Sequence, residues 1–281
     1  DKSLSHERLA YALFRRMGVP APRTAPVRVF VNGTLYGHYL HVETVDRRFL
    51  DRHFASNQGM LYEGTYWCQL ENGNARDDDS GCLTREFSPD ACDGAPPPGA
   101  DPEDYTPIRS LIARLEALPA GGFYPAVTEI LDWDHFLSMW AAEALLSHWD
   151  GYTYNIVNNY RIYHDPVVDR WTIIPSGLDQ TFQPNSIDEW DPSGTIGARC
   201  MAEPACQATF AARLAEATVV FESMQLEARR AAIREQLLAL VMVAPGRDFN
   251  LGSFETAHSS TAQFIANRAA QIRAVLAAHG F

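Results

Sequence analysis

The stretch His148-Trp149-Asp150-Gly151-Tyr152-Thr153-Tyr154-Asn155 carries the most specific chemical pattern in the chain. Its spacing, His-x-Asp-x-x-x-x-Asn, is that of the catalytic loop of protein kinases. In such a loop the Asp accepts the proton of the substrate hydroxyl, and the Asn binds a metal ion on the nucleotide phosphates. The pattern therefore predicts Asp150 as a catalytic residue and Asn155 as a ligand of metal and nucleotide.

The sequence around this stretch has the order that such a loop requires. An apolar helical pattern over 133–148 precedes it, and two strand-like runs over 159–163 and 171–174 follow as a second hairpin. Asp179 comes after the second run, where a kinase carries its metal-binding Asp. Three fixed residues also occur by chance. In that alternative, Asp150 and Asp179 are loop carboxylates that bind nearby backbone N–H groups.

The N-terminal part predicts a helix and a hairpin. Apolar residues recur at helical spacing over 4–17, and Gly18 follows as a stop signal. The strand-like runs 27–31 and 36–42 are joined by Asn32-Gly33, a strong hairpin signal. A short helix at 47–54 and a strand at 60–62 complete this part.

The rest of the chain divides into a polar excursion and a helical region. Residues 63–107 are rich in turn formers and carry three cysteines, so we expect them to lie outside the core fold. Helices are predicted over the ranges 108–118, 133–148, 207–222, 225–243 and 256–279. The predicted fold class is α+β, with a β-hairpin-containing N-terminal part and a mostly helical C-terminal part. We expect one domain over 1–281, made of segments 1–62, 63–107 and 108–281.

Length and charge restrict the function classes. The 281 residues allow a substantial core, and the formal net charge of −12 argues against binding to nucleic acid or anionic membranes. No apolar run is long enough to span a membrane. Lys2 is the one lysine, so any phosphate bound within the chain must be bound by arginine. Arg161, just after the motif, is a candidate; the alternative is that it is a solvated strand residue. Because the sequence begins without Met or a leader, we expect a processed N-terminus.

The cysteine spacing does not match a zinc site and favours disulfides. We predict Cys200–Cys206 as a local pair and a second bond between two of Cys68, Cys82 and Cys92, with Cys68 and Cys82 taken as the candidate pair. The fifth cysteine is then free or pairs elsewhere. This pattern favours a secreted, extracellular or cell-surface protein. The alternative is a cytosolic protein with five inert thiols.

At this point several segments together resemble one family, the spore-coat-protein-H-like (CotH) atypical kinases. They occur in the same order and cover most of residues 4–182. These segments are Arg8-Leu-Ala-Tyr-Ala-Leu-Phe-Arg-Arg-Met-Gly-Val-Pro-Ala-Pro-Arg23, Val31-Asn-Gly-Thr-Leu-Tyr-Gly-His-Tyr-Leu-His-Val-Glu-Thr-Val-Asp46, Phe49-Leu50, His148-Trp-Asp-Gly-Tyr152, Asn158-Asn-Tyr160 and Gly177-Leu-Asp-Gln-Thr-Phe182.

The resemblance implies a divergent protein-kinase-like fold that uses ATP with Mg²⁺ or Mn²⁺. The implied activity is phosphorylation of Ser or Thr in coat or other extracytoplasmic proteins. Carried over residue by residue, Asp150 is the catalytic Asp, Asn155 lies on the metal side and Asp179 binds metal. Glu43 would orient a phosphate-binding side chain, or else form a surface ion pair.

Some positions differ from the family pattern. Glu63 stands where the family has a Leu-Tyr-Lys-like step, Ser176 stands where many members carry Trp, and the chain begins close to the Arg-Leu-Ala-Tyr helix. These differences keep open an alternative function, a non-catalytic structural or assembly protein on a kinase-like fold (a pseudokinase). A hydrolase that uses two carboxylates is a third hypothesis, but nothing in the sequence sets the distance between two such carboxylates.

Overall fold

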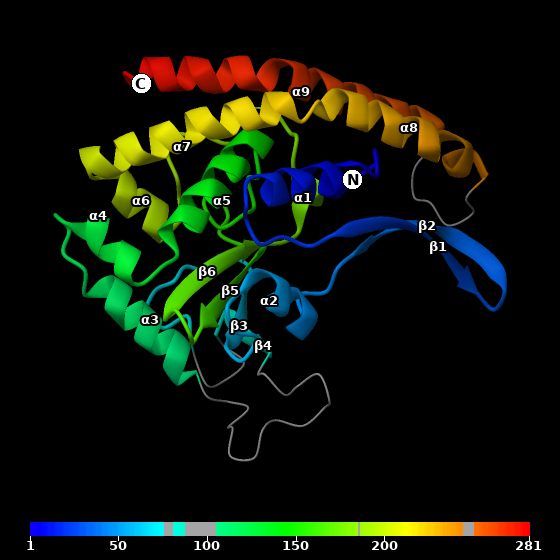
Figure 1. The fold of residues 1–281 in the computed structure, drawn as a ribbon. Helices are drawn as coiled ribbons and strands as arrows, with labels where there is room; N and C mark the ends of the chain where they lie inside the picture. Colours follow the sequence, from blue (N-terminus) through cyan, green and yellow to red (C-terminus); the bar gives the residue numbers. More distant parts are fainter. Residues whose placement is uncertain (76–80, 88–104, 185, 244–249) are drawn as a thin grey trace.

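The computed structural model describes residues 1–75, 81–87, 105–184, 186–243 and 250–281, and its fold is mixed α+β, as predicted (Figure 1). The elements in chain order are α1 (His6–Arg16), β1 (Thr24–Val31), β2 (Thr34–Val42), α2 (Arg47–His53), β3 (Met60–Gly64), β4 (Leu83–Phe87), α3 (Thr106–Glu116), α4 (Phe123–Ala126), η2 (Val127–Glu129), α5 (Trp133–Leu146), β5 (Tyr160–Asp165), β6 (Arg170–Pro175), η3 (Leu178–Gln180), α6 (Thr195–Met201), α7 (Pro204–Ser223), α8 (Leu226–Val243) and α9 (Leu251–Ala278).

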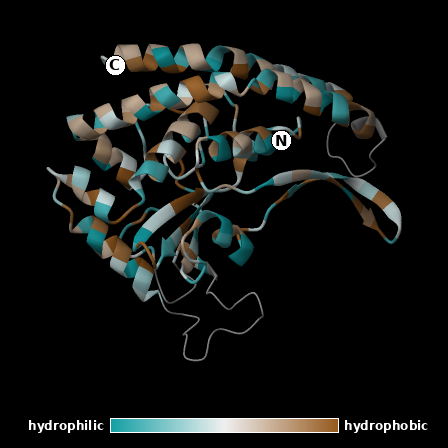
Figure 2. Cartoon of the chain, viewed as in Figure 1, coloured by the Kyte–Doolittle hydropathy of each residue, from teal (hydrophilic) through white to brown (hydrophobic). Residues whose placement is uncertain are grey.

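The β1–β2 hairpin is a two-stranded antiparallel ribbon that extends away from the other elements (Figure 1). Val31 pairs with Thr34, so the turn consists of Asn32 and Gly33 alone. Their φ angles of 50° and 79° are the two positive values that a tight hairpin turn needs, which explains the Asn-Gly pair. Apolar residues lie near the tip (Figure 2), and one of them, Phe30, is 58% exposed.

A second antiparallel sheet has the strand order β4-β3-β5-β6 and is packed on both faces. On one face α2 buries Phe49 and Leu50 against Leu61, Tyr163 and Ile174, which together form a small separate core. Residues on the opposite face belong to the main hydrophobic core, including Tyr62, Ile162 and Ile173. Covering both faces holds the β5–β6 hairpin in place, and this hairpin connects the predicted loop to Asp179.

Helix α5 is the centre of the helical region. It is buried on nearly every side, which is typical of a helix that is apolar all round. The ring of Trp140 stacks on Phe210 of α7 with centroids 3.6 Å apart. Helix α9 runs back along α8 and then α7 (Figure 1), so the C-terminal helices cover α5. The residues that follow α5 therefore start from a fixed position.

The segment 63–107 differs from expectation in its described part. Leu83–Phe87 forms β4 and pairs with β3, while Leu70 and Leu83 belong to the main core, so this part is not outside the fold. Apolar residues spaced among turn formers gave no strand periodicity, and only pairing with β3 shows the strand. The short helices α4 and α6 were likewise not predicted.

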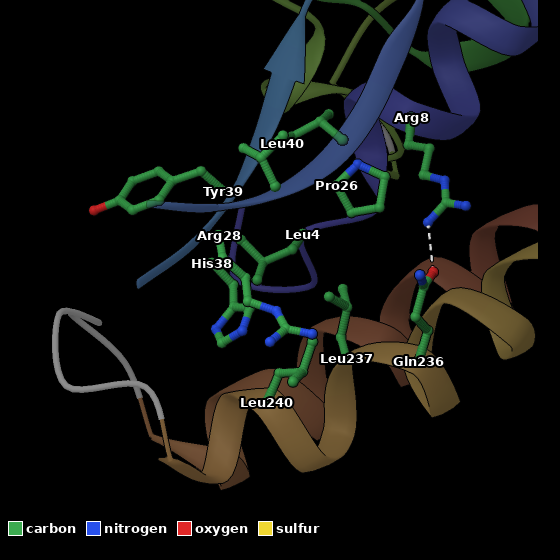
Figure 3. Close-up of a pocket in the computed structure, with 11 residues that line it drawn as sticks. Leu4, Arg8, Pro26, Arg28, His38, Tyr39, Leu40, Gln236, Leu237 and Leu240 are labelled. Carbon is green, nitrogen blue, oxygen red and sulfur yellow. Dashed lines mark hydrogen bonds between the residues drawn. The ribbon is translucent and has the colours of Figure 1, made fainter. Parts of the chain in front are cut away.

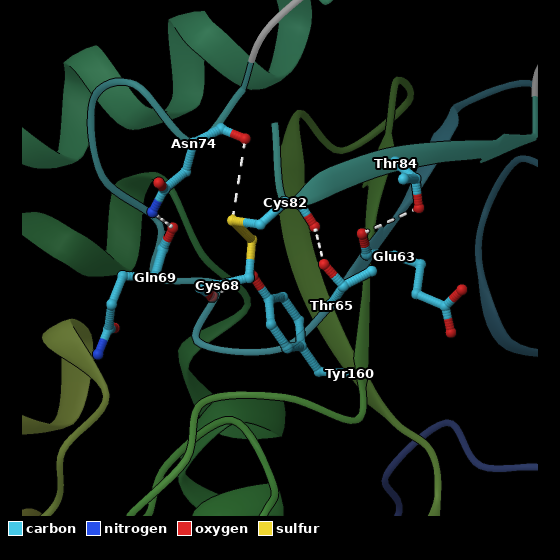
Figure 4. Close-up of a disulfide and its surroundings, with 8 residues drawn as sticks. All are labelled: Glu63, Thr65, Cys68, Gln69, Asn74, Cys82, Thr84 and Tyr160. Carbon is cyan, nitrogen blue, oxygen red and sulfur yellow. Dashed lines mark hydrogen bonds between the residues drawn. A yellow bond between two sulfur atoms is a disulfide. The ribbon is translucent and has the colours of Figure 1, made fainter. Parts of the chain in front are cut away.

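Two disulfides join the cysteine pairs that were proposed from the sequence. Cys68 and Cys82 are linked with an S–S distance of 2.17 Å (Figure 4), and Cys200 and Cys206 with 2.03 Å. The first bond connects the loop after β3 to the start of β4, where Tyr160 of β5 donates a hydrogen bond to the Cys68 carbonyl at 2.8 Å. Cys92 lies outside the described residues. In the part of the chain that the structure covers, no helix combines the length and apolarity that crossing a membrane requires.

Candidate active site

The C-terminus of α5 is held by distant parts of the chain. Arg268 of α9 donates to the carbonyl oxygens of Ala144 and Leu145, the second at 3.2 Å, and its guanidinium pairs with Glu189 at 2.6 Å. The backbone N–H of Phe182 donates to the Leu146 carbonyl at 2.7 Å. These bonds satisfy carbonyls that a helix end leaves without partners. They also fix the point at which residues 148–155 leave the helix. We call these residues the catalytic-loop stretch, after the kinase-like spacing of their sequence.

Glu143, on the last turns of α5, organises the backbone of this stretch. Its carboxylate is 0% exposed and accepts hydrogen bonds from the N–H groups of Tyr152 at 3.2 Å and Thr153 at 3.0 Å. A Cβ atom at Gly151 would lie 2.4 Å from Glu143 Oε1 and 2.6 Å from His148 Nδ1. The stretch therefore wraps around a buried carboxylate so closely that glycine is needed at 151.

Asp150 is held by a partner that the motif does not include. Its side chain is largely buried, and Oδ2 accepts a hydrogen bond from Asn159 Nδ2 at 2.9 Å. Oδ1 is buried, lies 3.4 Å from His148 Nε2 and has no hydrogen bond within the described residues. Burial raises the pKa of Asp150; His148 opposes the shift, while Asp179 and Glu143 add to it. The carboxylate is thus fixed in orientation with one acceptor oxygen available.

Asp179 lies in η3, shortly after β6, the second strand of the β5–β6 hairpin. Gly177 precedes it with φ of 59°, and a Cβ there would approach Asn159 Oδ1 to 2.3 Å. Asn159 therefore contacts Asp150 with its amide nitrogen and Gly177 with its amide oxygen. These contacts link the loop that carries Asp150 to the segment that carries Asp179. The Asp179 side chain is 46% exposed, and its charge acts on Asp150.

The N-terminal turns of α1 complete the surroundings of Asp179. His6 Nδ1 lies 3.0 Å from the Asp179 carbonyl oxygen, and burial lowers the pKa of His6 to about 4. Burial also raises the pKa of Glu7, and the negative charge of Asp179 adds to the shift. Burial raises the pKa of Tyr11, which is opposed by Arg161 and by a backbone hydrogen bond at Gly177. These α1 residues were not predicted as part of the site, because their spacing signals only an amphipathic helix.

The other predicted residues have different surroundings. Asn155, with φ of 22°, donates from Nδ2 to the Ser186 carbonyl at 2.6 Å. Arg161 of β5 pairs with Glu63 of β3, its cross-strand neighbour, at 3.0 Å. The structure thus links the positions of Asp150 and Asp179 through Asn159, which the spacing motif does not include. Asn159 also adopts a left-handed φ of 46°, so it both forms a turn and holds Asp150.

Glu43 follows β2 and joins two arginines at the base of the hairpin. It pairs with Arg23 and with Arg52, each at 2.7 Å. Burial alone would raise the pKa of Glu43, but hydrogen bonds from both guanidinium groups hold it below its usual value. Glu43 therefore remains ionised and orients two cations.

The donors near Asp150 fit a divalent cation of the Mg²⁺ type. Within the described residues there is no cluster of three or more His, Cys, Asp or Glu that could hold a metal alone. Mg²⁺ typically uses one or two carboxylates and completes its coordination with phosphate oxygens and water. The partly exposed Asp179 carboxylate supplies oxygens of this kind beside Asp150.

Comparison with known proteins identifies the family. The family model described as CotH kinase protein matches residues 1–272. The chain belongs to the CotH family. Inner spore coat protein H of Bacillus subtilis (strain 168) is 23% identical over 288 residues, which cover 97% of this chain and 75% of the relative. The CotH match includes every candidate residue described above, from the hairpin to Asp179.

Proposed function

We propose that this CotH chain transfers the γ-phosphoryl group of ATP to a Ser or Thr hydroxyl of a coat or other extracytoplasmic protein. The proposal includes a divergent protein-kinase-like fold that extends over 1–281 as one domain. The order of α5, the catalytic-loop stretch, the β5–β6 hairpin and Asp179 supports it, because kinases use the same order.

The observation that carries the proposal is the state of the Asp150 carboxylate. Asn159 holds Oδ2, and Oδ1 is left as a buried acceptor without a hydrogen bond in the described structure. A general base in phosphoryl transfer needs this combination of fixed orientation and a free acceptor oxygen. The hydroxyl proton would pass to Oδ1 as the hydroxyl oxygen bonds to the γ-phosphorus and the bond to ADP breaks.

The other residues would position charge. Asp179 would hold Mg²⁺ or Mn²⁺, with the amide oxygen of Asn155 as a further donor. A metal ion held there would supply positive charge that stabilises the negative charge on the ATP phosphates. Arg161, oriented by Glu63, would contact a phosphate, and Glu43 would orient Arg23 and Arg52 for the same purpose.

The first test separates nucleotide binding from transfer. ATP is titrated into the protein by calorimetry with Mg²⁺, with Mn²⁺ and with neither, and Asp179→Asn is expected to lose the metal-dependent binding. Transfer of γ-³²P from ATP to the chain itself and to a serine-rich peptide pool is then measured. Asp150→Asn is expected to lose about 10²–10⁴-fold in rate while ATP binding is retained.

Asp169→Asn is the matched control, because Asp169 lies on the exposed β5–β6 turn and pairs with His164. Its rate is expected to equal that of the unmodified protein. If folded protein binds no ATP with either metal, or if Asp150→Asn transfers phosphate at the full rate, the proposal is wrong.

One observation favours a second function, non-catalytic assembly in a coat or surface layer. The hairpin exposes several large apolar side chains, among them Phe30, Val31 and Tyr36, and such residues mark contact surfaces when they cluster. The name of the Bacillus relative and the two disulfides support a coat or cell-surface location for either function. Absence of nucleotide binding with normal assembly into a coat would favour this second function.

A further inference from the structure

A groove lies between α1, the β1–β2 hairpin and α8. It consists of two adjoining cavities of about 220 and 300 Å³, which share Arg8 and Gln236 as lining residues. We call the two together the α1–α8 groove. It lies on a different face of α1 from the active site, since Glu7 and Tyr11 interact with the segment at Asp179 while Arg8 and Arg15 line the groove.

The charge of this groove is opposite to that of the protein. The chain carries a formal net charge of −12, yet the described residues that line the groove include no Asp or Glu. Its charged or chargeable basic side chains are Arg8, Arg15, Arg28, Arg229 and His38. Four guanidinium groups without an acidic residue among them form a strongly positive local field.

Many donors in the groove have no partner in the described part of the protein. The Arg28 side chain makes no hydrogen bond or ion pair there, and both ring nitrogens of His38 are buried without a hydrogen bond. These two residues are directly opposite each other on β1 and β2. Arg8 donates to Gln236 Oε1 at 3.0 Å, and Arg229 to the Met224 carbonyl at 2.9 Å. Each guanidinium has five N–H donors, so most are available to an anion.

The wall opposite the cations is apolar. Leu237 and Leu240 of α8 point toward the hairpin strands and face Leu4, while Arg8 and Gln236 lie at the end of this cavity (Figure 3). In the adjoining cavity Leu9 and Ile233 have the same role. An occupant that suits the groove therefore carries both anionic groups and apolar side chains.

The shape favours an extended segment over a small anion. From Thr24 to Arg28 along β1 is about 13 Å, and from Arg229 to Leu240 along α8 is about 16 Å, at the usual rises per residue. This length matches four to five residues of extended peptide. The arginines are spread along it and do not converge on one point, as they would around a single phosphate.

We propose that the α1–α8 groove binds an extended acidic segment of a partner protein, with carboxylates on Arg8 and Arg28 and apolar side chains against Leu237 and Leu240. This binding does not depend on phosphoryl transfer. It would hold a partner beside the active site on the other face of α1.

The test is fluorescence anisotropy with a fluorescein-labelled peptide that has a Glu-Leu-Glu-Leu-Glu core. Peptides with Gln or Lys in place of Glu are the comparison probes. The Glu peptide is expected to bind with an affinity that falls as salt rises, because ion pairs are screened. The double variant Arg8→Ala/Arg28→Ala is expected to bind it at least tenfold more weakly.

Arg16→Ala is the matched control, because Arg16 is an exposed arginine on α1 that does not line the groove. It and Asp150→Asn are expected to bind the Glu peptide normally, which separates this inference from the proposed catalysis. Arg28→Glu, which removes no side-chain hydrogen bond or ion pair of the described structure, is expected to reverse the preference toward the Lys peptide.

Three results would overturn the inference. They are absence of binding of the Glu peptide to folded protein, equal affinity in the double variant, and displacement of the peptide by ATP. The last result would assign the groove to a nucleotide.

Discussion

The conformations of the catalytic-loop stretch after α5 and of the β1–β2 hairpin are maintained in opposite ways. The stretch is buried, and its backbone donates to Glu143 from the preceding helix, while Asp150 accepts from Asn159. The hairpin is largely exposed, and its turn depends on the local preferences of Asn32 and Gly33. Tertiary contacts thus hold the candidate chemistry, whereas local backbone preference holds the hairpin.

The difference suits the two proposed roles. A general base must keep one orientation, which requires buried partners whose own positions are fixed. A binding surface needs side chains that remain accessible, and the hairpin has these at Arg28 and at its apolar tip. Substitutions should therefore affect the two regions very differently.

The largest expected effect is that of Glu143→Ala. It leaves the buried N–H groups of Tyr152 and Thr153 without an acceptor and removes a carboxylate beside His148. An unsatisfied buried group costs about 1–3 kcal/mol, so we expect a loss of about 2–5 kcal/mol in the free energy of unfolding. Urea unfolding followed by circular dichroism measures it.

Glu129→Ala is the control, because the exposed Glu129 pairs with Arg170 on the surface. Its effect is expected to stay within about 1 kcal/mol. If both variants lose the same stability, the buried network does not maintain the loop.

A pair of glycine substitutions compares the two regions directly. At Gly151 an added methyl group would contact Glu143 and His148, and overpacking of this kind costs about 1–3 kcal/mol. At Gly33 the φ of 79° is strained for alanine, at about 1–2 kcal/mol, but the added methyl meets nothing within 4 Å. Gly151→Ala should also abolish phosphoryl transfer, whereas Gly33→Ala should leave it intact. Equal activity in the two variants would contradict the contrast.

The smallest expected effect is a pH dependence at Asp150. Burial raises its pKa in the folded protein above that of the unfolded chain, so ionisation destabilises the fold. Below the unfolded pKa there is no such penalty, and it develops as pH rises through the folded pKa. Asp150→Asn should therefore be more stable than the unmodified protein at neutral pH, with the advantage fading toward pH 4.

Thermal unfolding of both proteins across this range measures the difference. Asp169→Asn is expected to change stability in the opposite direction at neutral pH, because a hydrogen bond from His164 lowers the pKa of Asp169. A stability difference for Asp150→Asn that does not change with pH would show that the carboxylate is not penalised by burial.

Much of the fold was predictable from short patterns. Helical spacing predicted α1, α5, α7, α8 and α9 with small errors at their ends, and Asn32-Gly33 predicted the first hairpin. The α+β class and the two disulfides were predicted as well. The strand β4 was not, because its position depends on pairing with β3 and not on a pattern of its own.

The candidate site was predictable only in part. The motif indicated Asp150 and Asp179, and the structure places Asn159 in contact with Asp150 while Asn155 turns toward Ser186. The motif spacing selects Asn155, whereas no sequence pattern connects Asn159 with Asp150. Arg161 was a candidate by its place after the motif, but the register of β3 and β5 determines that Glu63 is its partner.

The sequence by itself determined much of the backbone: where the long helices run, where the chain turns at Asn32-Gly33, and which stretch carries the kinase-like spacing. These features depend on φ/ψ preferences and on periodicity, which act over a few residues. Only the tertiary structure decided the partners: Glu143 with the loop amides, Arg268 with the end of α5, and the arginines along the α1–α8 groove. Such contacts join residues up to more than a hundred positions apart. They arise from packing, which no local pattern records.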